Sequence, residues 1–280
     1  MVRFRGDDVQ LRIGSEDKHD AFLARHEQFF SRVDNLMTAE NAAFDRNLSA
    51  KGMLDPTVFY LGIRAVEDFN AIVLLAANGQ AHCANALVRG MFERVVTAAY
   101  QSDHPEEVQD FVDFDHVQKF RAAQAIDQSI GLNETEKVNL RQLRERYEEV
   151  KSRFLVDECK KCKTTRVGPS WSKLNFVAMT KKALPLDQLV AFGYYIPLSQ
   201  AHSTWESINS LLRSEDSDLI FRKDYSKECD IIFRLTHLLL LHVFRTQAKH
   251  FKIPAIEKAA AVLNSDYIAI YPEASSEVPE

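Results

Sequence analysis

Apolar residues recur every three or four positions through most of this chain, which is the spacing of one face of an α-helix. Phe22, Phe29, Val33 and Leu36 follow this spacing after Ser15, a residue type that often caps the first turn of a helix. No stretch alternates convincingly between apolar and polar residues, as a half-buried strand does. The pattern predicts an all-α protein.

Helix-starting and helix-ending residues divide the chain into about eight or nine predicted helices. Asp55-Pro56 supplies an N-cap followed by proline, and Gly79 stands where that helix would end. The run Asn-Glu-Thr-Glu at 133–136 resembles a capping box. Because short connections favour antiparallel neighbours, we expect a multi-helix bundle. The longer predicted helices include 15–50, 55–78, 80–101, 105–131, 133–154, 198–213 and 227–251.

Residues 156–172 form the least regular interior stretch. We expect one helical domain over 1–280. The alternative is a division at this stretch into an N-terminal helical group, 15–155, and a C-terminal helical group, 172–264. Residues 265–280 end in an acidic run of small side chains, which predicts a disordered tail.

The composition, 46% hydrophobic and 27% charged, is that of a soluble globular protein. The first residues lack the apolar segment of a secretion signal. The most apolar stretches are too short, or too interrupted by charge, to span a bilayer, which needs about 20 residues. Four cysteines without such a signal favour a reducing compartment. We therefore expect a cytoplasmic protein with no membrane partner.

Charge is distributed unevenly, although the net charge of −5 does not suggest a nucleic-acid-binding protein. Between Cys159 and Lys182 every charged residue is basic, and Trp171 and Phe176 lie among them. Basic residues with aromatic ones can hold phosphates and stack on bases. The other interpretation is a solvated loop. The candidate RNA-contacting residues are Lys160, Lys161, Lys163, Arg166 and Lys173.

Cys159 and Cys162 have the spacing of half a zinc knuckle. Structural zinc needs four ligands, and no second pair with suitable spacing follows. A flexible loop is the simpler interpretation, so we predict no metal site and no cofactor.

The predicted helix at 80–101 carries a narrow polar stripe on an otherwise apolar surface. At about 100° per residue, the stripe falls within a sector of about 80°. It either touches solvent or turns inward, where an Arg89–Glu93 pair would line a polar cavity. A buried pair of this kind needs further hydrogen bonds to offset its desolvation. The stripe consists of His82, Asn85, Arg89, Glu93 and Tyr100.

The predicted helix at 198–213 repeats this pattern with Ser199, His202 and Glu206. A His and a Glu four residues apart can ligate a metal, but carboxylate-bridged metal sites need Glu-x-x-His on two helices and further glutamates. That pattern is missing here. An exposed or hydrogen-bonded polar face is the preferred interpretation.

Arg245 and His250 stand near the end of the predicted helix at 227–251. In a straight helix, residues five apart point about 140° away from each other. The pair would converge only if the helix ended there, and Pro254 disfavours the helical conformation at Ile253. His242 lies on the apolar stripe and nearer to the face of Arg245.

The run Arg245-Thr-Gln-Ala-Lys-His250 resembles the Arg-x4–6-His motif of HEPN domains, many of which are metal-independent ribonucleases of toxin and anti-phage systems. The resemblance implies a homodimer that acts on RNA. Arg245 would stabilise the phosphate, and His250 would orient or deprotonate the 2′-hydroxyl. The sequence departs from that family at Thr246, where a residue such as Asn is frequent, and in its larger number of helices.

The segments ANALVRGMFERVVTAAY and YYIPLSQAHSTW are similar to a bacterial all-helical family of unknown function over residues 60–215. Two hypotheses follow. One is a HEPN-like ribonuclease or its inactive relative. The other is a non-enzymatic helical module that binds a protein or a small ligand through the two polar faces. The positions of Arg245 and His250 in the fold distinguish them.

Overall fold

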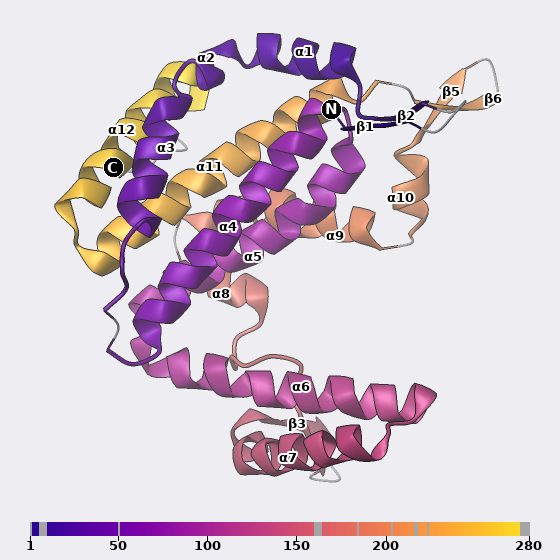
Figure 1. Ribbon diagram of the computed structural model, residues 1–280, viewed down its shortest axis with the longest axis vertical. Coiled ribbons are helices and arrows are strands. Elements are labelled where there is room, and N and C mark those ends of the chain that lie inside the picture. Colours follow the sequence, from indigo (N-terminus) through magenta and orange to yellow (C-terminus); the bar gives the residue numbers. More distant parts are fainter. Residues whose placement is uncertain are drawn as a thin grey trace.

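The computed structural model describes residues 2–5, 10–49, 51–159, 164–183, 185–202, 204–215, 218–222 and 224–274. Three long helices form its centre: α4 (Leu54–Ala77), α5 (Ala81–Asp103) and α11 (Ser226–Phe251). They run beside one another in Figure 1, and each contacts the other two. The prediction of an all-α fold is confirmed.

Shorter helices surround this centre. On one side, α12 (Pro254–Ile270) packs against α11 and against α3 (Val33–Phe44). α1 (Glu16–Arg25) contacts α4, and α2 (Glu27–Phe30) connects α1 to α3. α8 (Phe176–Lys182) and α9 (Ile196–Ala201) pack against α5, and α10 (Trp205–Asn209) follows α9.

Local sequence determines where the central helices end. Gly79 follows α4 with a φ of 72°, a left-handed conformation that glycine adopts without strain. Lys252 ends α11 with a φ of 52°, and Ile253 after it is extended because it directly precedes Pro254. Pro254 then begins α12, where its missing N–H costs no hydrogen bond.

Apolar side chains from both ends of the chain form one main core. It includes Phe22 and Phe29 from the N-terminal helices and Phe233 and Leu263 from the C-terminal ones. The rings of Phe29 and Phe233 meet edge to face with centroids 4.8 Å apart. Burying such a ring contributes about 1.5–3 kcal/mol. The groups 15–155 and 172–264 therefore share a core.

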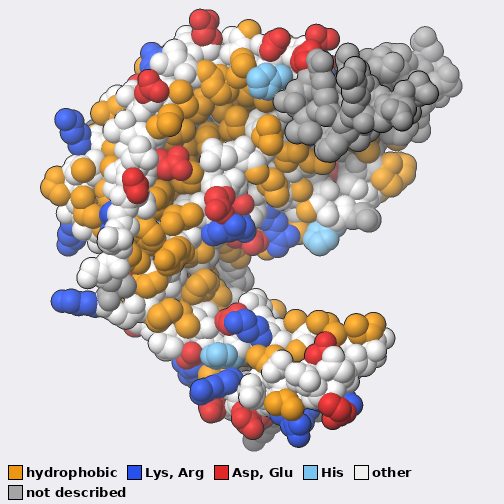
Figure 2. All heavy atoms as spheres, in the orientation of Figure 1, with side chains coloured by type: hydrophobic (Ala, Val, Ile, Leu, Met, Phe, Trp, Pro, Cys, Tyr) orange, Lys and Arg blue, Asp and Glu red, His pale blue; other side chains and the backbone are white. Residues whose placement is uncertain are grey.

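Two antiparallel helices project from the bundle in Figure 1: α6 (Val108–Ile130) and α7 (Glu134–Val150), together called the arm. The predicted capping box at Asn133 is confirmed at the start of α7. A small separate core lies beneath the two helices, and Trp171 packs against this core and the main one. Figure 2 shows a hollow between the arm and the bundle. The small core consists of Phe114, Val117, Val150 and Phe154.

The described residues contain twelve α-helices, more than the eight or nine expected. The predicted helix at 15–50 is three helices, since the backbone leaves the helical region at His26 and Arg32. The predicted helix at 198–213 contains the end of α9, α10 and the start of a strand. Residues 265–270 belong to α12, not to a tail, because buried Tyr267 holds them against the core.

Three short antiparallel hairpins were not predicted, because strands of four or five residues are too short to show clear alternation. Among the described residues, none of the helices has the length and apolar composition that crossing a bilayer requires. The hairpins pair β1 (Val2–Arg5) with β2 (Gln10–Ile13), β3 (Leu155–Cys159) with β4 (Thr164–Val167), and β5 (Leu212–Glu215) with β6 (Asp218–Phe221).

Candidate functional site

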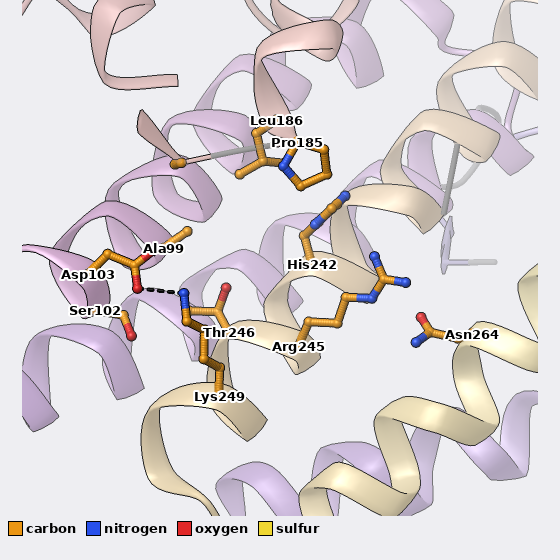
Figure 3. A pocket seen from close by; sticks show the side chains of 11 residues that line it. Ala99, Ser102, Asp103, Pro185, Leu186, His242, Arg245, Thr246, Lys249 and Asn264 are labelled. Carbon is orange, nitrogen blue, oxygen red and sulfur yellow. Dashed lines mark hydrogen bonds and ion pairs between the residues drawn. The ribbon is translucent and has the colours of Figure 1, made fainter. Parts of the chain in front are cut away.

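A pocket of about 460 Å³ opens beside α11, bordered by the end of α5 and by α12 (Figure 3). It contains two of the residues singled out in the sequence, His242 and Arg245. Because α11 is central, its side chains reach this pocket from the same helix that holds the main core. The lining residues are Ala99, Ser102, Asp103, Ala183, Pro185, Leu186, His242, Arg245, Thr246, Lys249 and Asn264. We call this the α11 pocket.

Two cations, Arg245 and Lys249, stand one helical turn apart in the α11 pocket. Arg245 is half-buried, and burial lowers the pKa of its guanidinium, which nevertheless stays protonated at pH 7. The Lys249 Nζ atom lies 2.6 Å from Asp103 Oδ1, and the Lys249 side chain is 65% exposed. The charged lining residues are thus two cations and one carboxylate.

His242 lies beside Arg245 and is neutral at pH 7. Burial, with a smaller contribution from the charge of Arg245, lowers the pKa of His242 to about 3. Within the described residues its ring has no hydrogen bond, so it can offer one donor and one acceptor. In Figure 3 the Arg245 guanidinium lies between His242 and Asn264. The Asn264 Oδ1 atom is also buried, without a hydrogen-bond partner in the described part of the chain.

His250 does not line the α11 pocket. Its Nε2 atom lies 3.0 Å from Asp55 Oδ1, and its Nδ1 atom lies 3.2 Å from Ser102 Oγ. A ring protonated at Nε2 donates to Asp55 and accepts the Ser102 hydroxyl. The His250 side chain is only 9% exposed. α11 continues as helix through Phe251, so Arg245 and His250 are not brought together.

The polar stripe on α5 is divided among separate partners. Arg89 Nε lies 2.9 Å from Glu93 Oε1, and the Arg89 guanidinium also lies over the Tyr194 ring at 4.8 Å. Both side chains of this ion pair are partly exposed. Asn85 is buried and donates to Gln200 Oε1 at 2.6 Å. The Arg89–Glu93 pair therefore touches solvent.

His82 and Tyr100, at the two ends of this stripe, lie in different surroundings. His82 packs against the Tyr225 ring at 4.9 Å, and burial lowers its pKa. Tyr100 donates to Glu107 Oε1 at 2.8 Å. Burial and this hydrogen bond raise the pKa of Tyr100 to about 12.

The second predicted polar face is broken by the gap between α9 and α10. Ser199 donates its hydroxyl to the Ile196 carbonyl oxygen at 2.8 Å, while His202 and Glu206 are exposed. The Asn85–Gln200 hydrogen bond joins α5, which carries the first stripe, to α9, which carries Ser199.

The basic segment is only partly described. Lys160, Lys161, Cys162 and Lys163 lie outside the described residues. Arg166 on β4 and Lys173 are exposed. Trp171 packs against Phe111 with ring centroids 5.4 Å apart, and Phe176 packs against Tyr194 at 4.7 Å. Both rings are partly buried and pack against other aromatic side chains of the fold.

Residues 57–219, more than half of the chain, match a family of unknown function, DUF5677. The chain belongs to this family. The expected likeness to a family of unknown function is thereby confirmed, whereas the HEPN-like motif is not. No curated protein and no solved structure matches the chain.

The DUF5677 match begins in α4, includes the arm, and ends before α11. It therefore covers the α5 wall of the α11 pocket but not His242, Arg245 and Lys249. Within the described part of this DUF5677 protein, no group of three or more His, Cys, Asp or Glu side chains is placed to hold a metal ion.

Five polar residues of the pocket were not predicted as site residues: Ser102, Asp103, Thr246, Lys249 and Asn264. Lys249 had a usable signal, because it lies one turn after Arg245 on the same face. Asn264, Asp103 and Ser102 had none, since only tertiary packing brings α12 and the end of α5 to α11.

Proposed function

We propose that this DUF5677 protein binds a small ligand through an anionic group in the α11 pocket. One observation carries the proposal: Arg245 and Lys249 line the same pocket as a neutral His242 and a buried, unpartnered Asn264 oxygen. Ligand pockets typically combine an apolar wall with a few convergent polar groups. Here Ala99, Pro185 and Leu186 supply the apolar wall.

The chemistry suits a carboxylate or a phosphate. A guanidinium binds either group through two parallel hydrogen bonds. The half-buried position of Arg245 strengthens such bonds, because solvent screening is weaker there. The neutral His242 ring can add one hydrogen bond without a charge. The Asn264 side chain adds a further polar group to the pocket lining.

The test is a calorimetric titration of the full chain with acetate and with inorganic phosphate at pH 7. We expect Arg245→Gln to weaken binding by about 10- to 100-fold, because charge-assisted hydrogen bonds contribute roughly 1.5–3 kcal/mol. Lys249→Gln removes a more exposed charge and should weaken it by about two- to fivefold. The control is Lys227→Gln, an exposed cation at the start of the same helix. Absence of saturable binding to the native chain, or equal binding to Arg245→Gln, would overturn the proposal.

A metal-independent ribonuclease is the second candidate. The observation that favours it is Ser102, which lines the α11 pocket and also hydrogen-bonds to His250. The Ser102 hydroxyl therefore connects His250 to the pocket that Arg245 lines. This candidate implies a cytoplasmic homodimer acting on RNA, and it requires His250 to leave Asp55 so that it can act on a 2′-hydroxyl.

The ribonuclease candidate is tested by incubating the protein with total RNA in the presence of EDTA. Cleavage should disappear in both His250→Ala and Arg245→Ala. Cleavage that persists in His250→Ala would remove that residue from any catalytic role. No cleavage by the native chain would leave the ligand-binding proposal as the sole candidate.

A further inference from the structure

A second pocket, of about 380 Å³, adjoins the α11 pocket. Pro185 and His242 line both pockets, so the two spaces meet at these residues. The second pocket extends along α11 toward its beginning, over Leu238, Leu235 and Ile231.

The two pockets differ in chemistry. Leu189, Phe192, Ile231, Leu235 and Leu238 make the second pocket largely apolar, and we call it the apolar groove. Phe192 is 53% exposed and Ile231 is 61% exposed, so apolar surface here faces solvent. Covering such surface is favourable because it removes apolar area from water.

The charge at the far end of the groove is balanced within the chain. Arg234 Nη1 lies 2.9 Å from Glu273 Oε1, and the Arg234 guanidinium also lies over the Tyr271 ring at 5.3 Å. At its other end the groove meets the α11 pocket, which is lined by the cations Arg245 and Lys249.

His242 suits the boundary between the two spaces. Its ring is buried and neutral, with a pKa near 3. A neutral imidazole has two apolar ring faces and two hydrogen-bonding nitrogens on its edge, so it can contact both an apolar group and a polar one. A charged residue here would instead penalise an apolar group that crossed from one pocket to the other.

We propose that the two pockets form one site for an amphiphilic anion, a small molecule with a single carboxylate or phosphate head and an unbranched apolar tail. The head binds at Arg245 and Lys249, and the tail lies along Leu238, Leu235 and Ile231. This inference rests on the proposed anion-binding function and adds the class of ligand. Charge complementarity at one end and exposed apolar surface at the other favour this occupant.

The test is the dependence of affinity on tail length. Acetate, butanoate, hexanoate, octanoate and decanoate are titrated into the full chain below their micelle concentrations, with inorganic phosphate and octyl phosphate as the phosphate pair. Each added methylene that enters the groove should tighten binding by about two- to fourfold. Comparing the affinities of octanoate and octyl phosphate, which have tails of similar length, identifies the preferred head group. Decanol, which lacks the charge, should bind far more weakly than decanoate.

Two variants test the binding of the head group and of the tail separately. Ile231→Ser should weaken decanoate binding by about three- to tenfold and leave acetate binding unchanged. Lys249→Gln should weaken both by the same factor. The matched control is Leu74→Ser, which removes an equally exposed apolar side chain, 64% exposed, from α4. All three positions are on the surface, and circular dichroism will confirm that the variants fold.

The failures are distinguishable. If acetate or phosphate binds through Arg245 but affinity does not rise with tail length, the amphiphile inference is wrong and the anion-binding proposal stands. If affinity increases with tail length to the same extent in Ile231→Ser as in Leu74→Ser, the tail lies elsewhere and the inference is also wrong. If no anion binds, both the anion-binding proposal and the amphiphile inference are wrong. If Ile231→Ser changes the sedimentation of the protein but not decanoate affinity, the groove is an interface between copies of the chain.

Discussion

The bundle and the arm differ in where their polar side chains lie. α11 buries His237, His242 and Gln247 inside the main core. The arm keeps its charges in solvent, in short-range pairs such as Glu134 with Lys137 and Arg146 with Glu149. Figure 2 shows charged side chains spread over the arm. Exposed pairs of this type contribute little to stability, about 0–1 kcal/mol each.

The candidate site lies in the bundle and not in the arm. Groups held away from water have shifted pKa values and unused hydrogen-bonding atoms, and such groups surround the α11 pocket. The arm has its own small core and supplies no lining residue to that pocket. We therefore expect perturbations of the bundle to affect the whole molecule and those of the arm to remain local.

The largest effect is expected from Phe233→Ala in the main core. Removing this fully buried ring should lower the free energy of unfolding by about 3–5 kcal/mol. Urea denaturation measures the change. Phe114→Ala, the counterpart in the arm, should accelerate hydrogen exchange in residues 108–150 and leave α11 protected. Equal loss of protection in both regions would show that the arm and the bundle unfold as one unit.

Acid should destabilise the bundle specifically. Burial lowers the pKa of His237 to about 3, as it does for His242. Below about pH 6.5 the unfolded chain takes up protons that the folded chain refuses, so stability falls as the pH is lowered from there toward 3. Each histidine contributes up to about 1.4 kcal/mol per pH unit.

Urea denaturation between pH 7 and pH 4.5 measures this slope. His237→Phe should remove about half of the part due to these two residues, while exposed His19→Gln should leave it unchanged. An identical slope in His237→Phe and the native chain would contradict the assignment.

A close backbone contact gives a smaller effect. A methyl group at Gly62 would lie 2.5 Å from Gln247 Nε2 and 2.9 Å from Phe44 Cε1. Gly62→Ala should therefore displace the buried amide that donates to the Val58 carbonyl oxygen, and destabilise the protein by about 1–3 kcal/mol. Thermal unfolding measures the change. Gly131→Ala in the arm meets no neighbouring atom but has a φ of 74°, so its strain should appear only as faster exchange in the arm.

The smallest effect concerns the start of α7. Asn133→Ala removes the side chain that accepts from the Glu136 N–H and should cost about 1 kcal/mol. Hydrogen exchange should accelerate in the first turns of α7 alone. Asn133→Asp keeps an acceptor at this position and should restore protection. A fall in the global unfolding temperature of several degrees would show that α7 is coupled to the bundle.

The sequence predicted those helix ends that depend on neighbouring residues in the chain. Asn133 and Gly79 mark ends that depend only on adjacent residues, and both were found in the sequence. The breaks at His26 and Arg32 were not, because they let Phe22 and Phe29 reach rings on α11, more than 200 residues away. Arg245 and His242 were recognised as candidates on one helix. Their partners were not, since Asn264 and Asp103 reach the pocket from other helices.

The order of the central helices in the chain has a consequence for synthesis. α4 and α5 are complete about 120 residues before α11 begins. At about 5–20 residues per second, the ribosome needs roughly 6–25 s to make that interval. Throughout this time the faces of α4 and α5 that α11 later contacts have no permanent partner. The nascent chain thus exposes the apolar faces of this helix pair for seconds, and we expect chaperones that act at the ribosome exit to bind it during that time.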